Sequence, residues 1–328
     1  MSRRSVAFAT TLTLPLLALA ACGDTSSDSA SGGDTGGDKL SVVTSFYPLQ
    51  YAVQQVGGDH VDATNLTKPG TEPHDLELSP QDTLSVSKAD AVIYLSGFQP
   101  AVDDAVKEAG DKAHDVHDAA RLDLKATDDG HDHGGDHADH DHADEGDHAD
   151  EEHAEGNDPH FWLDPNRYAD VADAIAADLS AADPDNAADY KANAKDLRER
   201  LGTLNTEFKT GLASCEHKDL VTSHAAFGYL AKAYGFDQEG ITGITPESEP
   251  SAKQMADIVA HIKEHKVPTI YAETLVPRDV ADTIAKEANA TVMVLDPIEG
   301  ITDESAAQDY FGVMRANLET LKKGQVCS

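Results

Sequence analysis

The middle of this 328-residue chain carries the pattern of one long amphipathic helix. Between residues 190 and 212 the apolar side chains recur every three or four residues, which places them on one helix face. These side chains are Tyr190, Ala194, Leu197, Leu201, Leu204, Phe208 and Leu212. A helix from Asn186 to Leu212 would be about 40 Å long at ~1.5 Å per residue. It is therefore long enough to pass along two folded lobes as a stiff spine.

Two sets of alternating strands and helices flank this helix. Strands are expected at 40–46, 61–66 and 91–95 before it, and at 219–223, 269–272 and 291–295 after it. Helices are expected at 225–234, 251–266 and 278–288. A shorter helix ends at Asp183, before Pro184, with an inner face of Tyr168, Val171, Ile175 and Leu179. The alternation predicts two parallel-sheet α/β lobes, 39–185 and 214–328, bridged by one rigid helix at 186–213, and rocking of the lobes rather than wide closure.

A segment without Lys or Arg lies between Lys125 and Arg167 and is rich in acidic residues and glycine. It holds His131, His133, His137, His140, His142, His148 and His153. Because it has almost no apolar side chains, we expect residues 126–157 to be disordered. Neutral imidazole is a common ligand for zinc and copper, so these histidines are predicted to be auxiliary, weak metal ligands on a mobile arm. The alternative is a solvated acidic spacer.

The N-terminus has the pattern of a secretory signal. Two arginines precede an apolar stretch from Val6 to Ala21, and small residues stand before Cys22. The sequence Leu19-Ala20-Ala21-Cys22 resembles the lipobox of bacterial lipoproteins, in which the cysteine is acylated. We therefore expect a signal peptide at 1–21, lipidation of Cys22 and a flexible tether at 22–38. Only the lipid would then hold the protein to the outer face of the bacterial cytoplasmic membrane, because no later apolar run is long enough to span a bilayer.

The remaining cysteines and the net charge narrow the function further. Cys215 and Cys327 form an even pair in an oxidising compartment, which favours a disulfide over two unpaired thiols. The net charge of −35 argues against nucleic acid as a partner, because phosphate binding needs a basic surface. An acidic surface attracts cations without choosing among them, so selectivity must come from a geometric site.

Four residues at predicted loops could form such a site. In open α/β sheets, ligands bind beyond the carboxyl ends of the strands. His74 lies in a proline-rich loop, His160 lies between Asp158-Pro159 and Phe161-Trp162, His224 follows a strand, and Asp296 ends one. Any one of these histidines, taken alone, is more often an ordinary hydrogen-bonded side chain. Three imidazoles and a carboxylate from both lobes would form a closed tetrahedral site for zinc, without an open position for an activated water, which favours capture over catalysis.

The contexts of these four residues resemble a known family. The segments are Pro73-His74, Asp158-Pro159-His160-Phe161-Trp162-Leu163, Ser223-His224-Ala225-Ala226-Phe227-Gly228-Tyr229 and Leu295-Asp296-Pro297. They are similar to those of zinc-binding ABC-transporter solute-binding lipoproteins of the ZnuA kind, and the likeness runs from Lys39 to Val326. The resemblance implies two lobes bridged by a long helix, a Zn²⁺ ion held between them by His74, His160, His224 and Asp296, a membrane permease as partner, and a non-enzymatic, monomeric receptor.

Residues at two positions bear on which metal the family resemblance implies and on which residue is the fourth ligand. Manganese members of the family place a glutamate where His224 stands, so the histidine favours zinc. Some zinc members fill the fourth place with water or a glutamate, which leaves Asp296 open. Glu273 follows its own strand and could accept a hydrogen bond from a ligand imidazole, or equally could be a structural or helix-capping carboxylate.

The sequence also leaves alternative functions and further histidines to consider. His261-Ile262-Lys263-Glu264-His265 matches the H-x-x-E-H pattern of some zinc peptidases, which would make the protein a secreted zinc hydrolase. We interpret the match as accidental, because the same helix has an apolar stripe and these histidines can lie on its polar side. His114 and His117 are expected to be surface residues. A manganese or other divalent-metal receptor of the same fold, and a metal buffer or adhesin without a transporter, are further alternatives.

Overall fold

The computed structural model describes residues 39–126, 156–246 and 248–328, all within one compact unit. Cys22 and the seven histidines between 131 and 153 lie outside the described residues, so their expected roles stay predictions.

The first lobe is a parallel sheet with the strand order β2-β1-β3-β4. Its strands are β1 (Leu40–Thr44), β2 (Val61–Asn65), β3 (Ala91–Tyr94) and β4 (Ala113–Asp115). Its helices are α1 (Tyr47–Gly57), α2 (Pro80–Lys88), α3 (Pro100–Ala105) and α4 (His117–Ala120), with short 3-10 turns between them. Valine and isoleucine on β1 and β3 are buried, as expected for strands covered on both faces. The three-residue edge strand β4 was not predicted, because a run this short shows no apolar pattern.

The second lobe repeats this plan with the strand order β6-β5-β7-β8. Its strands are β5 (Asp219–Thr222), β6 (Asp237–Gly240), β7 (Thr269–Ala272) and β8 (Thr291–Val294). Its helices are α7 (Gly228–Tyr234), α8 (Ala252–His265), α9 (Asp279–Ala288) and α10 (Tyr310–Gly324). Strand β6, with the polar sequence Asp-Gln-Glu-Gly, and helix α10 were not predicted. Helix α7 begins three residues later than expected, because the backbone from 223 to 227 is irregular.

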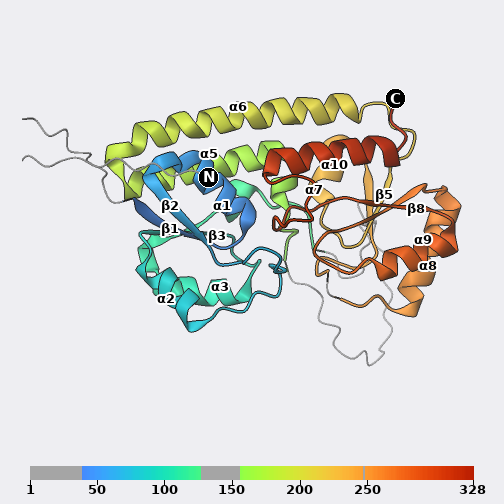
Figure 1. Ribbon diagram of the computed structural model, residues 1–328, viewed down its shortest axis with the longest axis horizontal. Helices are drawn as coiled ribbons and strands as arrows, with labels where there is room; N and C mark the ends of the chain where they lie inside the picture. Colours follow the sequence, from blue (N-terminus) through green and yellow to red (C-terminus); the bar gives the residue numbers. More distant parts are fainter. Residues whose placement is uncertain (1–38, 127–155, 247) are drawn as a thin grey trace, which may run out of the picture. The chain divides into compact units, whose positions relative to one another are not determined.

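The predicted spine is present as α6 (Ala187–Gly211), one residue shorter at each end than expected. Preceded by α5 (Pro165–Ala182), it packs against α1 and α5 of the first lobe and against α10 of the second (Figure 1). The expected fold, two parallel-sheet α/β lobes joined by a long helix, is thus confirmed. The predicted disulfide is also confirmed, since Cys215, just after α6, is bonded to Cys327, just after α10.

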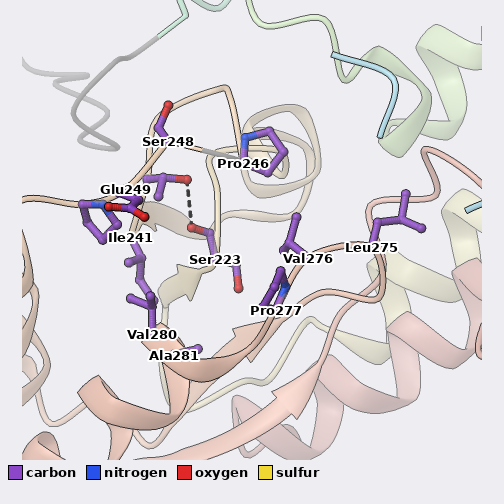
Figure 2. Close-up of a pocket in the computed structure, with 12 residues that line it drawn as sticks. Ser223, Ile241, Pro246, Ser248, Glu249, Leu275, Val276, Pro277, Val280 and Ala281 are labelled. Atoms are coloured by element: carbon purple, nitrogen blue, oxygen red, sulfur yellow. Dashed lines mark hydrogen bonds between the residues drawn. The ribbon is translucent and has the colours of Figure 1, made fainter. Parts of the chain in front are cut away.

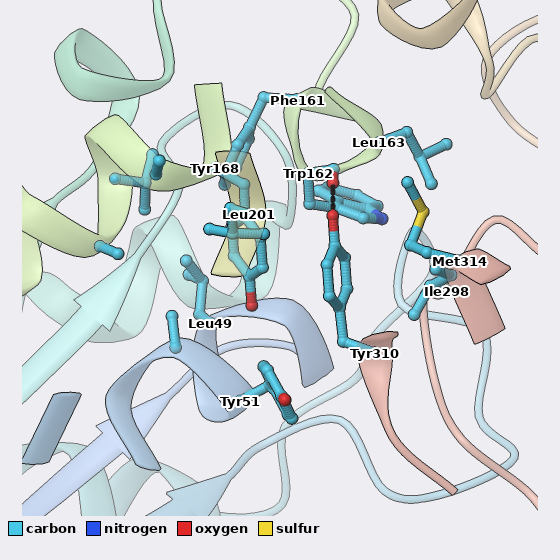
Figure 3. Close-up of a cluster of buried hydrophobic side chains, with 14 of the residues drawn as sticks. Leu49, Tyr51, Phe161, Trp162, Leu163, Tyr168, Leu201, Ile298, Tyr310 and Met314 are labelled. Atoms are coloured by element: carbon cyan, nitrogen blue, oxygen red, sulfur yellow. Dashed lines mark hydrogen bonds between the residues drawn. The ribbon is translucent and has the colours of Figure 1, made fainter. Parts of the chain in front are cut away.

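One apolar core runs from the first lobe into the second, with aromatic side chains at its centre (Figure 3). The Tyr310 hydroxyl donates a 2.6 Å hydrogen bond to the carbonyl of Trp162, so α10 of the second lobe is tied to the loop after His160. The Trp162 indole N–H donates to the carbonyl of Pro297 at 2.7 Å. These bonds hold loops of both lobes in fixed positions beside each other. Within the described ranges, no helix combines the length and apolar character that a bilayer crossing requires.

Candidate metal centre

Four buried or nearly buried side chains from both lobes converge at one point. They are His74 and His160 from the first lobe and His224 and Glu299 from the second, and one potential ligand atom from each lies within 4.8 Å of all the others. Three predicted site residues are therefore brought together. The fourth member of the cluster is Glu299, not Asp296.

His74 is positioned by the rigid loop that follows β2. The side-chain amide of Gln99 donates to the carbonyl of Pro73 at 3.0 Å, which fixes the backbone just before the histidine. The ring of Phe98 lies edge-on to the imidazole, with the centroids 4.8 Å apart. The backbone N–H of His74 donates a hydrogen bond to the carboxyl group of Glu72. Burial and the negative charge of Glu299 raise the pKa of Glu72 to about 8.

His160 is held by a local turn. The carboxylate of Asp158 accepts a 2.9 Å hydrogen bond from the backbone N–H of His160 and lies 2.7 Å from its Nδ1. Both side chains are buried. An anionic oxygen at Nδ1 keeps a proton on that nitrogen and directs Nε2 into the centre. Asp158 was part of the quoted motif, but its orienting role was not predicted.

His224 has the same arrangement with a partner from a different strand. Glu273, which follows β7, accepts from the backbone N–H of His224 at 3.0 Å and lies 2.7 Å from its Nδ1. In the irregular segment after β5, Ala225 donates its N–H to the carbonyl of Gly243 at 2.9 Å, which ties this segment to the loop after β6. Of the two roles considered for Glu273, the geometry corresponds to the acceptor for an imidazole N–H.

Asp296 directs the turn that brings Glu299 into the centre. Its Oδ1 accepts a 2.8 Å hydrogen bond from the N–H of Ile298, which is an Asx turn. Ile298 has φ of +60°, an unfavourable conformation for a β-branched residue. Asp296, the expected fourth ligand, does not belong to the four-residue cluster. Its Oδ1 bonds the backbone of its own loop, while its Oδ2 is buried without a hydrogen-bond partner. The signal that could have found Glu299 is a second carboxylate three residues after the first.

The three imidazoles point their Nε2 atoms at one carboxylate. Glu299 Oε1 lies 3.0 Å from Nε2 of His74, 3.0 Å from Nε2 of His160 and 3.7 Å from Nε2 of His224. The Nε2 atoms of His160 and His224 are 3.4 Å apart. Glu299 Oε2 is buried without a hydrogen-bond partner. With protons on Nδ1, neighbouring Nε2 lone pairs would repel one another unless a proton or a metal cation lay between them.

The pKa shifts also indicate that the centre stabilises positive charge on the imidazoles beside negative charge on the carboxylates. Burial lowers the pKa of His160 and of His224, but the adjacent carboxylates outweigh burial and raise both pKa values, that of His224 well above the ordinary value. Burial lowers the pKa of His74. Burial alone would raise the pKa of Glu299, but hydrogen bonds from the three imidazoles hold it well below the usual range. Without metal, protons on the imidazoles supply part of the charge that a divalent cation supplies.

The remaining predicted residues lie elsewhere. His114 contacts Asp178 at 3.1 Å and His117 lies 3.7 Å from Asp118, and neither belongs to the four-residue cluster. His261 and His265 lie beside Asp219 on the second lobe.

A separate, mainly apolar pocket lies next to this centre in the second lobe. Figure 2 shows it between the loop of Pro246 and Ser248 and the loop of Leu275, Val276 and Pro277. Ser223, which precedes His224, also lines it. None of the described residues that line it is a histidine or cysteine, so its chemistry does not suit a zinc ion.

The family model for the periplasmic zinc-uptake complex component A, ZnuA, matches residues 42–324 of this chain. The chain belongs to the ZnuA family. It is 36% identical over 308 residues to the high-affinity zinc uptake system protein ZnuA of Bacillus subtilis, with 93% of each chain covered. It is 39% identical over 287 residues to the zinc-binding protein AdcA of Streptococcus pyogenes serotype M3, covering 87% of this ZnuA-family chain but only 56% of AdcA. The chain thus spans little more than half the length of its AdcA relatives.

Solved structures agree with the family assignment. The Zn(II)-bound ZnuA-like domain of Streptococcus pneumoniae AdcA is 32% identical, with a TM-score of 0.68, and 88% of this chain and 99% of that one are covered. The laminin-binding protein Lmb of Streptococcus agalactiae, described as a bifunctional adhesin and metal transporter, is 30% identical with a TM-score of 0.72, and 87% of this chain and 99% of Lmb are covered. The ZnuA family description names a component of zinc uptake rather than a class of enzymes.

Proposed function

We propose that this chain is an extracytoplasmic receptor that binds one Zn²⁺ between its lobes and delivers it to the permease of an ABC importer. The proposed ligands are His74, His160, His224 and Glu299. The observation that carries the proposal is the convergence of three Nε2 atoms and a carboxylate whose Oε2 is buried and has no hydrogen-bond partner. Matches to zinc-binding and zinc-uptake proteins support it.

The donor set favours zinc over harder ions. Three imidazoles and one carboxylate suit a borderline cation that prefers four ligands, with Zn–N distances of about 2.0–2.1 Å. A manganese receptor is the weaker candidate, because Mn²⁺ prefers oxygen and His224 offers nitrogen. The proposed function is non-catalytic, because four protein ligands leave no open position for a zinc-bound water.

Delivery to a permease requires release as well as capture. All four proposed ligands lie on loops, and the shared core with α6 limits how far the lobes can move. We assign release to small rearrangements of these loops at the permease, with the receptor acting as a monomer. Lipidation of Cys22 would keep the receptor at the membrane, and the histidines between 131 and 153 would collect zinc weakly.

The test is zinc titration of the protein in competition with a chelator. His224→Ala is expected to lose the tight site, while His60→Ala, which removes a surface imidazole paired with Asp189, keeps it. Deleting residues 128–155 should remove weak binding and leave the tight site intact. Tight binding unchanged in His224→Ala would exclude this centre. Cells that need this chain for growth in zinc-poor medium should be rescued by the wild type and not by His224→Ala.

A further inference from the structure

Three side chains on the second lobe form a second cluster with metal-ligand chemistry. Asp219 is the first residue of β5, and His261 and His265 lie one turn apart at the end of α8. One potential ligand atom from each lies within 4.8 Å of the others. From this geometry we propose a second, weaker binding site for Zn²⁺ or Cu²⁺, formed by His261, His265 and Asp219.

The cluster is separate from the metal centre. Asp219 stands at the amino end of β5, whereas His224 follows the carboxyl end of the same strand. Helix α8 ends at His265, on the Asp219 side of the sheet. The two clusters therefore lie at opposite ends of the strands of one sheet and share no residue.

The distances suit a shared cation. Oδ1 of Asp219 lies 2.8 Å from Nδ1 of His265 and 3.3 Å from Nε2 of His261. Two ligand atoms of a tetrahedral zinc ion, each about 2.0–2.1 Å from the metal, are roughly 3.3 Å apart. The imidazole centroids are 4.2 Å apart with an interplanar angle of 31°, so both rings face the same side of the helix. Only small side-chain shifts would admit the ion.

A buried ring nitrogen of His261 without a hydrogen bond supports a cation at this cluster. Nε2 of His261 is buried and makes no hydrogen bond, although Asp219 Oδ1 is only 3.3 Å away. A buried polar nitrogen without a hydrogen bond is costly, and a cation between His261 and Asp219 would remove that cost. His265 is more exposed than His261, which leaves a side open for solvent as a further ligand.

The backbone around the cluster is held in place, and its field favours a cation. The side-chain amide of Gln325 donates to the carbonyl of Asp219 at 2.9 Å, which fixes the start of β5. His261 and His265 lie in the last turns of α8, where the unpaired carbonyl groups carry partial negative charge. With three protein ligands and partial exposure, the site should bind more weakly than the buried centre. Copper should bind it more tightly than zinc, following the general order for divalent ions.

In this proposal the two histidines of the H-x-x-E-H pattern bind a metal ion but do not take part in peptidase chemistry. The pattern places two imidazoles one turn apart, and the proposed third ligand is Asp219 from a neighbouring strand. The glutamate of the motif, which is the catalytic base in such peptidases, does not belong to the cluster.

The experiment is equilibrium dialysis of the full chain against Zn²⁺, and separately against Cu²⁺. The His261→Ala/His265→Ala double variant is expected to bind one ion fewer than the wild type while retaining the tight site. A matched control, His60→Ala/His117→Ala, removes two surface imidazoles that each face a single aspartate and should bind as many ions as the wild type. The histidines between 131 and 153 are the same in all three proteins, so their contribution cancels.

Two further measurements locate the ion. Asp219→Asn retains both imidazoles and should weaken the same site without affecting the tight one. Crystals soaked in Zn²⁺ should show an anomalous peak between His261 Nε2, His265 Nδ1 and Asp219 Oδ1. The proposal is overturned if the double variant and the wild type bind equal numbers of ions, whether or not the buried centre binds zinc.

Discussion

The indole N–H of Trp162 donates a 2.7 Å hydrogen bond to the carbonyl of Pro297. Trp162 stands two residues after His160, and Pro297 stands two residues before Glu299. The bond therefore joins the loop of a first-lobe ligand to the loop of a second-lobe ligand. It ties the geometry of the proposed zinc site to the apolar core that contains Trp162.

Replacing Trp162 by Phe should weaken both the fold and zinc binding. The carbonyl of Pro297 would be left buried without its donor, at a cost of about 1–3 kcal/mol in the free energy of unfolding. Tyr234→Phe is a control, because it also removes one side-chain donor, to Asn205, but none of the four proposed ligands. Urea unfolding of the metal-free proteins and chelator competition measure the two effects. Equal zinc affinities for Trp162→Phe and Tyr234→Phe would show that the cross-lobe bond does not support the site.

The roles of Glu299 and Asp296 can be separated by amide substitutions. Glu299→Gln removes the negative charge that faces three imidazoles and should reduce zinc affinity by more than ~100-fold, above the range usual for groups that only orient a ligand. Asp296→Asn keeps an oxygen to accept from Ile298 N–H, so the turn and most of the affinity should remain. Chelator competition compares the two variants. A larger loss for Asp296→Asn than for Glu299→Gln would restore Asp296 as the ligand.

Asp158 and Glu273 should each contribute to zinc affinity without touching the ion. Both carboxylates lie 2.7 Å from the Nδ1 atom of a proposed ligand. Asp158→Asn or Glu273→Gln should weaken zinc binding by about 10–100-fold, because the imidazole loses its anionic partner. Asp178→Asn, which changes a carboxylate beside His114 outside the site, is the control. Affinity measurements that find no difference from this control would contradict the orienting role.

Without metal, stability should fall as pH rises above about 6.5, the ordinary pKa of histidine. The pKa values of His160 and His224 are raised on folding, so their contribution is fully present below the unfolded pKa and is lost as pH rises through the folded pKa. His74, whose pKa is lowered, acts mainly below this window. Zinc-loaded protein should show the opposite trend, because zinc binding requires deprotonated imidazoles.

Urea unfolding across this pH range, with a chelator or with zinc, measures both trends. His224→Gln should flatten the metal-free trend, because it removes the histidine whose pKa is raised most clearly. A metal-free protein that became more stable as pH rose through this window would contradict the assigned shifts.

Much of the architecture followed from local patterns. The periodic apolar face of 190–212 predicts α6 nearly to its ends, because burial of one face sets a helical repeat. Strand β7 was predicted with its observed bounds, because its buried run is bounded by the clear helices α8 and α9. Strand β6 could not be predicted from Asp-Gln-Glu-Gly, since it forms only by pairing with β5.

The sequence by itself determined the class of fold, the spine helix and three imidazoles that tertiary folding brings together, because apolar periodicity and loop chemistry are local properties. Only the tertiary structure decided which carboxylate meets those imidazoles. Asp296 and Glu299 stand three residues apart, and the hydrogen bond from Ile298 to Asp296 uses the first carboxylate to turn the chain and brings the second into the centre. That choice depends on the backbone path of one loop, which no spacing along the chain reveals.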